Sequence, residues 1–168
     1  MRAARRHDSV KALVEGGAQL DLIGDNWRQS PFADRPDFRV HPPVSYLEML
    51  GLMPRARIVF NVLPAFPDGS HDRVFCGLLN GAVSVTDPTP YLAGALVDGE
   101  EVVLHPIADR ATLPERVRAP LAEDARLAAI AARGREKCRR LHTWSARATT
   151  ILELAETASI LRALGTTG

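Results

Sequence analysis

The 168-residue chain has only two cysteines, few aromatic residues and almost no net charge. Cys76 and Cys138 do not stand at the spacing of a zinc site or a redox motif, so we expect free thiols in a reducing compartment. Aromatic residues make up 5% of the chain, and the formal net charge is +1. Neither value fits a nucleic-acid partner, and the arginine-rich segment at 133–140 is interpreted as a solvated helix face.

Long apolar runs and the common nucleotide motifs are also missing. No apolar stretch is long enough to span a bilayer, and no signal-peptide segment follows the basic N-terminus, so we expect a cytoplasmic protein. The absence of G-x-G-x-x-G, G-x-x-x-x-G-K-[ST] and G-x-S-x-G argues against the usual nicotinamide, ATP and serine-hydrolase sites. The five histidines lack ligand spacing, so the sequence predicts no metal site.

The chain does contain a regular alternation of short strands and helices. Hydrophobic residues make up 46% and charged residues 24%, which suffices for one domain with its own core. We expect strands at 19–23, 38–41, 58–63, 82–86 and 101–105. A first helix should end at Gly16–Gly17, and a second, capped by Ser45 and Glu48, should run to about Met53. Further helices are expected from Leu113 onward, with breaks near Gly134 and at Thr143. This order predicts an α/β, Rossmann-like fold with a doubly wound, mostly parallel sheet at about 1–112 and C-terminal helices at about 113–168.

The stretch from Arg57 to Asp87 is the most informative part of the chain. A β-branched apolar run ends at Leu63, and a loop rich in proline, glycine and polar residues begins at Pro64. A helical pattern with one apolar face follows and is expected to end at Asn80–Gly81 with a left-handed C-cap. The next strand begins at once, which predicts a βαβ unit whose loop lies at the carboxyl edge of the sheet, where open α/β sheets bind ligands.

Two interpretations of this loop stay open. In the first, the free N–H groups of the helix N-terminus hold an anion such as a diphosphate, together with Gly69, Ser70, His71 and Arg73. In the second, Asp68 and Ser70 are ordinary helix caps, and His71 and Arg73 lie on a solvated face. For an isolated βαβ unit the second interpretation is the commoner one.

The segment FPDGSHDRVFCGLLNGAVSVTD resembles the donor-site signature of GT-B glycosyltransferases, most closely the group 1 family that includes the spore-protein glycosyltransferase-like domains. Three flanking pieces follow that family's order, namely LIGDNW at 22–27, RVHPPVSYLEML at 39–50 and GREKCRRLHTWSARATTIL at 134–152. The resemblance implies the C-terminal, donor-binding domain of such an enzyme, with a nucleotide-diphosphate sugar as donor substrate and no cofactor. No Asp-x-Asp motif for a metal ion occurs, so we expect metal-independent transfer.

The resemblance also implies roles for single residues around the loop. Many GT-B enzymes have two glutamates there, and the corresponding positions are Asp68 and Cys76. Asp68 keeps the acidic function, whereas the Cys76 thiol cannot hold ribose hydroxyls as a carboxylate does. Asp72 is a candidate substitute, although a first-turn carboxylate favoured by the helix dipole is the commoner explanation. We expect Asp68 and Arg73 to be catalytic, with Arg73 and the N–H groups of Gly69 and Ser70 stabilising the leaving diphosphate.

A second loop corresponds to the family's nucleobase site. It comprises His41, Pro42, Pro43 and Val44, and the family uses mainly backbone groups there to contact the base. Without the resemblance, the Pro-Pro pair would indicate only a rigid turn after a strand. Gly24, at the carboxyl end of its strand, and Asn61 are expected to line the same crevice.

By the same comparison, two parts of the family's fold are missing from the sequence. The chain begins inside a helix that follows a central strand in the family, and the N-terminal acceptor domain is absent. We therefore expect a truncated product, a fragment, or one partner of a larger assembly. Omitting a central strand leaves backbone groups unpaired. We expect the flanking strands to close together, or a second chain to supply the pairing.

Two hypotheses about function follow. The first is the donor-binding half of a nucleotide-sugar-dependent glycosyltransferase with an unknown acceptor. The second is a non-catalytic Rossmann-like remnant that serves as a binding or assembly module, and it is favoured by Cys76 and by the missing half.

Overall fold

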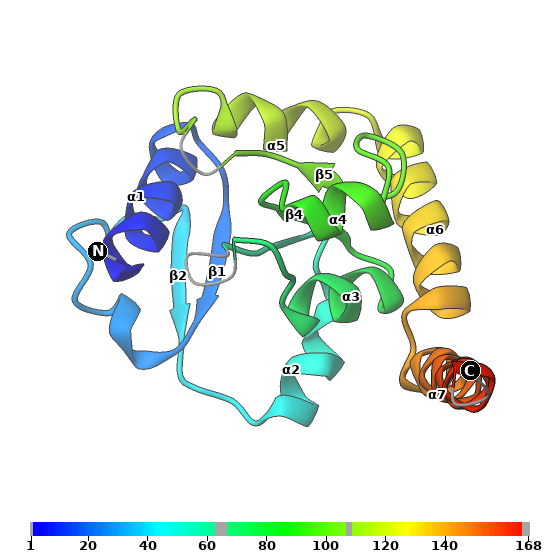
Figure 1. Ribbon diagram of the computed structural model, residues 1–168. Coiled ribbons are helices and arrows are strands. Elements are labelled where there is room, and N and C mark those ends of the chain that lie inside the picture. The colour runs from blue at the N-terminus through cyan, green and yellow to red at the C-terminus, as the bar shows by residue number, and fades with distance from the viewer. Residues whose placement is uncertain (1, 63–66, 107–108, 166–168) are drawn as a thin grey trace.

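Two parallel sheets form the centre of the protein, of which the computed structural model describes residues 2–62, 67–106 and 109–165 (Figure 1). The smaller sheet pairs β1 (Leu20–Ile23) with β2 (Phe38–His41). The larger sheet has the order β3 (Ile58–Phe60), β4 (Val83–Thr86), β5 (Val103–Leu104). The helices are α1 (Arg2–Glu15), α2 (Tyr46–Leu52), α3 (Asp72–Leu79), α4 (Pro90–Ala95), α5 (Leu113–Leu121), α6 (Asp124–Leu141) and α7 (Trp144–Gly165), with short 3-10 helices η1 (Asp25–Trp27) and η2 (Met53–Arg55).

Local signals in the sequence place several helix ends correctly. Ser45 caps α2 through a reciprocal pair with Glu48, in which each backbone N–H donates to the other residue's side chain, at 3.3 and 2.8 Å. Gly81 ends α3 with φ of 85°, a conformation that glycine adopts without steric cost. The Thr143 hydroxyl accepts a hydrogen bond from Ala146 N at 3.2 Å at the start of α7. These three predictions are confirmed.

Other boundaries differ from the predictions. The strand expected at 58–63 ends at Phe60, and Leu63 and Pro64 lie outside the described residues. The break predicted near Gly134 is wrong, because α6 runs through this residue and the helices separate at 122–123. A Cβ atom on Gly134 would lie 2.3 Å from the Glu101 carbonyl oxygen and 2.8 Å from Leu78 Cδ2. The absence of a side chain at Gly134 therefore lets α6 pack closely against Glu101 and Leu78.

The larger sheet is covered by helices on both faces. On one face Val83 and Val85 pack with residues of α1, α5 and α6. On the other face α3 and α4 form a second cluster with Val102 and with Cys138 of α6. All four residues of β4 are buried. The prediction of a Rossmann-like fold with helices around a parallel sheet is thus confirmed.

Helix α1 joins the two sheets. Its Leu13 belongs to the cluster on the larger sheet, whereas Val10 and Val14 belong to a cluster on the smaller sheet. In the part of the chain that the structure describes, no backbone ladder connects β1 with β3. The expectation that the flanking strands close together is therefore wrong, because the side chains of Leu20 and Phe60, which pack into both clusters, join the sheets instead. Pairing by a second chain stays a prediction.

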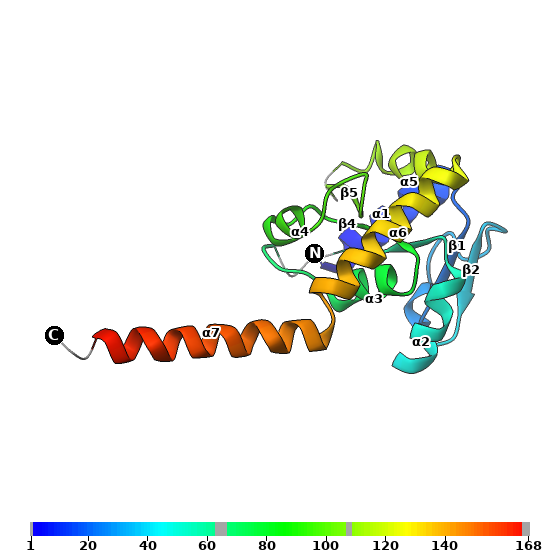
Figure 2. The same ribbon diagram turned by 90° about the vertical axis from the view of Figure 1, so that its right-hand side faces the viewer.

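Helix α7 extends away from the two sheets (Figure 2). Trp144 at its start is 88% exposed, and Ile151, Leu152, Leu154 and Ile160 are also exposed. Within the described ranges, no helix has both the length and the hydropathy needed to cross a membrane.

Candidate functional site

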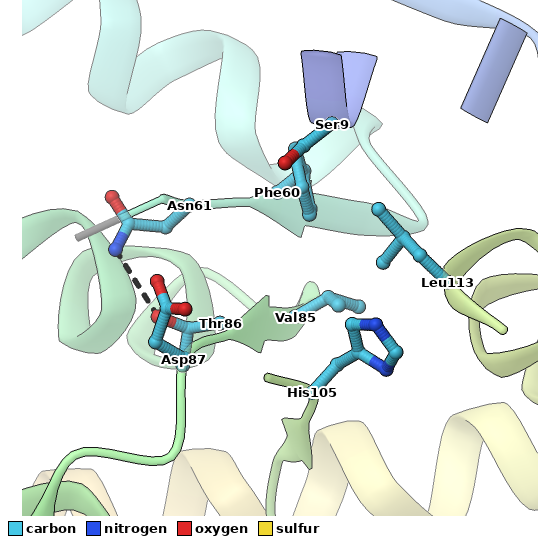
Figure 3. Close-up of a pocket in the computed structure, with 8 residues that line it drawn as sticks. All are labelled: Ser9, Phe60, Asn61, Val85, Thr86, Asp87, His105 and Leu113. Atoms are coloured by element: carbon cyan, nitrogen blue, oxygen red, sulfur yellow. Dashed lines mark hydrogen bonds between the residues drawn. The ribbon is translucent and has the colours of Figure 1, made fainter. Parts of the chain in front are cut away.

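Polar residues stand at the carboxyl end of every strand in the larger sheet. Asn61 follows β3, Thr86 and Asp87 stand at the end of β4, and His105 follows β5. Because the strands are parallel, these residues meet at one edge, where they line a pocket with Ser9 of α1 (Figure 3). The pocket is too narrow to admit a water molecule, so any ligand at this edge has to lie at its outer side.

Asn61 connects this edge to the start of α3. Its side chain is 1% exposed, and its Nδ2 donates to the Thr86 hydroxyl at 3.2 Å. Its Oδ1 accepts a hydrogen bond from Arg73 Nη1 at 3.0 Å. Surrounding protein atoms desolvate the guanidinium and lower the pKa of Arg73; the charge of Asp72 opposes this shift, and the nearby Arg6 adds to it. An arginine side chain nevertheless stays protonated in a protein, so Arg73 supplies a fixed positive charge here.

The loop before α3 is attached to the start of α4. The Thr89 hydroxyl donates to the Gly69 carbonyl at 2.7 Å and accepts from Leu92 N at 3.2 Å, which caps α4. The contact places the loop at 67–71 beside the β4–α4 connection, at the carboxyl edge of the sheet. The N-terminus of α3 and the strand ends thus lie at the same edge.

The N-cap of α3 differs from the one predicted. The second interpretation assigned capping to Asp68 and Ser70, but the cap residue is His71, whose Nδ1 accepts from Arg73 N at 3.2 Å. The imidazole takes this role because the helix begins only at Asp72. Asp72 Oδ1 lies 2.5 Å from the same His71 Nδ1 atom. When Nδ1 carries a proton, it can donate to the Asp72 carboxylate. A protonated Nδ1 cannot accept from Arg73 N, so His71 then no longer caps α3.

Cys76, one turn further along α3, contacts α2. Its Sγ lies 3.5 Å from the Tyr46 hydroxyl, and this hydrogen bond raises the pKa of Tyr46 to about 12. Tyr46 is the first residue of α2, which begins just after the loop His41–Val44. The proposed ribose position and the proposed nucleobase loop are therefore neighbours in space.

The nucleobase loop itself continues from the smaller sheet. The His41 imidazole lies 2.7 Å from Asp21 Oδ1, across the open face of the sheet. Gly24 N donates to the His41 carbonyl at 3.0 Å, with φ of 126° at Gly24, so the carboxyl ends of β1 and β2 are joined. Pro42 and Pro43 are exposed and Val44 is half-buried. Gly24 thus lies beside this loop, and Asn61 lies at the edge of the larger sheet.

The structure brings together some of the predicted site residues. Arg73 is hydrogen-bonded to Asn61 at the carboxyl edge, and Gly69 is held at the same edge by Thr89; Asp68 and Asp72 are exposed, and Ser70 is half-buried. Sequence reasoning missed Thr86, Thr89, Tyr46 and His105. For Thr86 and His105 the available signal was their place as the last, polar residues of predicted strands. In the described segments, no three His, Cys, Asp or Glu side chains lie close enough to hold a metal ion.

These features define a Rossmann-like domain with a candidate anion site at the carboxyl edge of its sheet. The model of the glycosyl transferase-like family matches residues 3–153, so the chain belongs to this family. The solved structure of sucrose-phosphate synthase from Thermosynechococcus elongatus is similar, with a TM-score of 0.74 and 17% sequence identity. The match covers 93% of this chain and 43% of that chain, and it shows the GT-B type of fold. No curated protein gives a significant match.

Proposed function

We propose that the chain is the donor-binding half of a nucleotide-sugar-dependent glycosyltransferase, with the donor's diphosphate at the start of α3. The observation that carries this proposal is the contact between Arg73 and the buried Asn61 at the carboxyl edge. It provides a cation at the N-terminus of an eight-residue helix, where backbone N–H groups also favour an anion. The family match supports a glycosyl donor as the source of that anion.

The proposed chemistry is stabilisation of the leaving group. The bond from sugar C1 to the diphosphate oxygen breaks and its electron pair stays on the oxygen. The nucleophilic group of the unidentified acceptor forms the new bond to C1, and its proton passes to the departing diphosphate. Arg73 and the N–H groups of Gly69 and Ser70 stabilise the charge that develops on the diphosphate. Asp68 binds sugar hydroxyls. We propose that no metal ion takes part, since the sequence lacks an Asp-x-Asp motif.

A second candidate function is a binding or assembly module without catalysis. Cys76 stands where many GT-B enzymes have the carboxylate that holds ribose, and its thiol contacts Tyr46. A thiol is a weak hydrogen-bond partner, so affinity for the nucleoside would be low.

Calorimetric titration distinguishes the two candidates. The protein is titrated with uridine, guanosine, thymidine and adenosine diphosphates, alone and linked to sugars. The donor-binding function predicts saturable binding. Asp68→Ala should abolish binding of the sugar-linked diphosphates, and Arg73→Ala should weaken binding about tenfold or more, because a charge-assisted hydrogen bond contributes about 1.5–3 kcal/mol. Arg55→Ala in η2, also an exposed arginine, is the matched control and keeps wild-type affinity. No binding of any nucleotide supports the non-catalytic module.

The two cysteines offer an independent measurement. Cys138 is fully buried, and burial raises the pKa of its thiol to about 12, so it stays unreactive in the folded protein. Cys76 is half-buried beside the proposed ribose position and is expected to react with a thiol reagent. A bound nucleotide should slow this reaction. An unchanged rate at saturating nucleotide would contradict the proposed position of the ribose.

A further inference from the structure

Asn61 is an unusual residue for its buried place at the end of β3. Its backbone N–H donates to Val85 O at 2.9 Å, and both ends of its side-chain amide are hydrogen-bonded, to Thr86 and to Arg73. A buried amide is tolerated only when such bonds are made, and the two side-chain bonds fix the orientation of the amide. The fixed amide oxygen in turn restricts the guanidinium of Arg73.

The neutral charge of the Asn61 amide matters for Arg73 as much as the position of the amide does. An arginine has five N–H donors and a flexible chain, so one bond to a neutral oxygen reduces its conformational freedom and leaves the other donors available. A carboxylate at the same place would form an ion pair and cancel the positive charge that an anion needs. The pair of Asn61 and Arg73 therefore has the chemistry of an oriented cation whose hydrogen-bond partner is neutral, while the charge of the neighbouring Asp72 acts on Arg73 without a hydrogen bond between Asp72 and Arg73 in the described structure.

We infer that Asn61 is a positioning residue, which aims the Arg73 guanidinium at a diphosphate group at the carboxyl edge of β3. The inference rests on the proposed function for its biological meaning. The ligand chemistry alone is a diphosphate, which inorganic pyrophosphate also provides. Pyrophosphate thus tests the positioning role separately from any use of a nucleotide sugar.

The experiment compares two substitutions of Asn61 by titration with pyrophosphate. Asn61→Asp has nearly the same shape and keeps an acceptor for Arg73, while the Thr86 hydroxyl can donate to it; the new carboxylate should weaken pyrophosphate binding about tenfold or more. Asn61→Leu removes both side-chain bonds and should weaken binding three- to tenfold. In the double variant Asn61→Leu/Arg73→Ala, the Asn61 change should add no further loss to that of Arg73→Ala.

Two readouts separate positioning from a general loss of structure. As the pH falls, the carboxyl introduced by Asn61→Asp becomes protonated. The affinity of this variant for pyrophosphate, divided by that of the wild type at the same pH, should then rise toward one. A structural defect would not recover in this way. Ser84→Ala is the matched control, because Ser84 is also buried in the larger sheet and donates to Val74 O at 2.8 Å; this variant should lose stability and keep its affinity.

The outcomes are distinct. Wild-type affinity in both Asn61 variants, together with a loss in Arg73→Ala, would overturn the positioning role. A deficit in Asn61→Asp that does not change with pH, or no pyrophosphate binding by the wild type, would overturn it as well. Pyrophosphate binding that depends on Asn61, without binding of any nucleotide sugar, supports the inference and refutes the proposed function.

Discussion

The two sheets differ in how completely their faces are covered. Helices pack on both faces of the larger sheet, and every residue of β4 is buried. The smaller sheet is covered on one face by α1, Trp27 and Phe32, which pack against Phe38 of β2, while Asp21, Arg39 and His41 occupy its exposed face. Parallel sheets are usually covered on both faces. We therefore expect the larger sheet to hold most of the stability and the smaller sheet to depend on its aromatic cluster.

The largest expected effect concerns that aromatic cluster. Phe38 is 3% exposed and makes edge-to-face contacts with Phe32 and Trp27, at centroid distances of 4.8 and 6.4 Å. Phe38→Ala should cost about 3–5 kcal/mol of unfolding free energy, because it removes apolar contacts and leaves a cavity. In a Trp144→Phe background, Trp27 is the single tryptophan and reports on the smaller sheet. In a urea titration, the fluorescence of Trp27 should change at a lower urea concentration than the far-UV circular dichroism signal does. Coincident transitions would show that the two sheets unfold as one unit.

An intermediate effect on stability is expected for Gly134 in α6, a helix that packs on the larger sheet. Gly134→Ala should lower the unfolding free energy by about 1–3 kcal/mol, because the added methyl group meets the Glu101 carbonyl oxygen and Leu78. Gly51 in α2 is the matched control, since nothing lies within 4 Å of its added Cβ. Gly51→Ala should stabilise by up to about 1 kcal/mol through helix propensity. Thermal unfolding of both variants measures the difference, and an equal response would mean that α6 does not pack closely at Gly134.

The smallest effect is expected on the exposed face of the smaller sheet. The hydrogen bond from His41, followed by the contact with Arg39, lowers the pKa of Asp21. A lowered carboxyl pKa adds stability above the unfolded value of about 3.9, and this contribution is lost as the pH falls through the folded pKa. Asp21→Asn should thus cost less than about 1 kcal/mol near pH 6, since the pair is exposed, and nothing at pH 2.

Urea unfolding at the two pH values tests this last expectation. Asp34→Asn, also an exposed carboxylate in this part of the chain, serves as control. High salt should reduce the Asp21 effect near pH 6 through screening. A cost that persists at pH 2 would mean that Asp21 contributes through packing instead of charge.

Features that depend on nearest neighbours along the chain were predictable. Ser45 with Glu48, Gly81 and Thr143 mark helix ends through bonds or dihedral angles within a few residues. Gly134 misled the prediction, because a glycine that breaks a helix and a glycine that lets a helix approach another segment look alike in sequence. Asn61 was expected in the crevice, but its bonds to Thr86 and Arg73 join residues 25 and 12 positions away.

The sequence by itself determined the order of the strands and of most helices, although not α4, together with the parallel arrangement of the strands and the resemblance to a donor-binding domain, because periodicity, caps and loop motifs act over short stretches of chain. Only the tertiary structure decided that the strands form two sheets joined by α1, and that Asn61 holds Arg73. These features depend on which distant side chains come within contact distance. That is a property of packing in three dimensions, which no local pattern encodes.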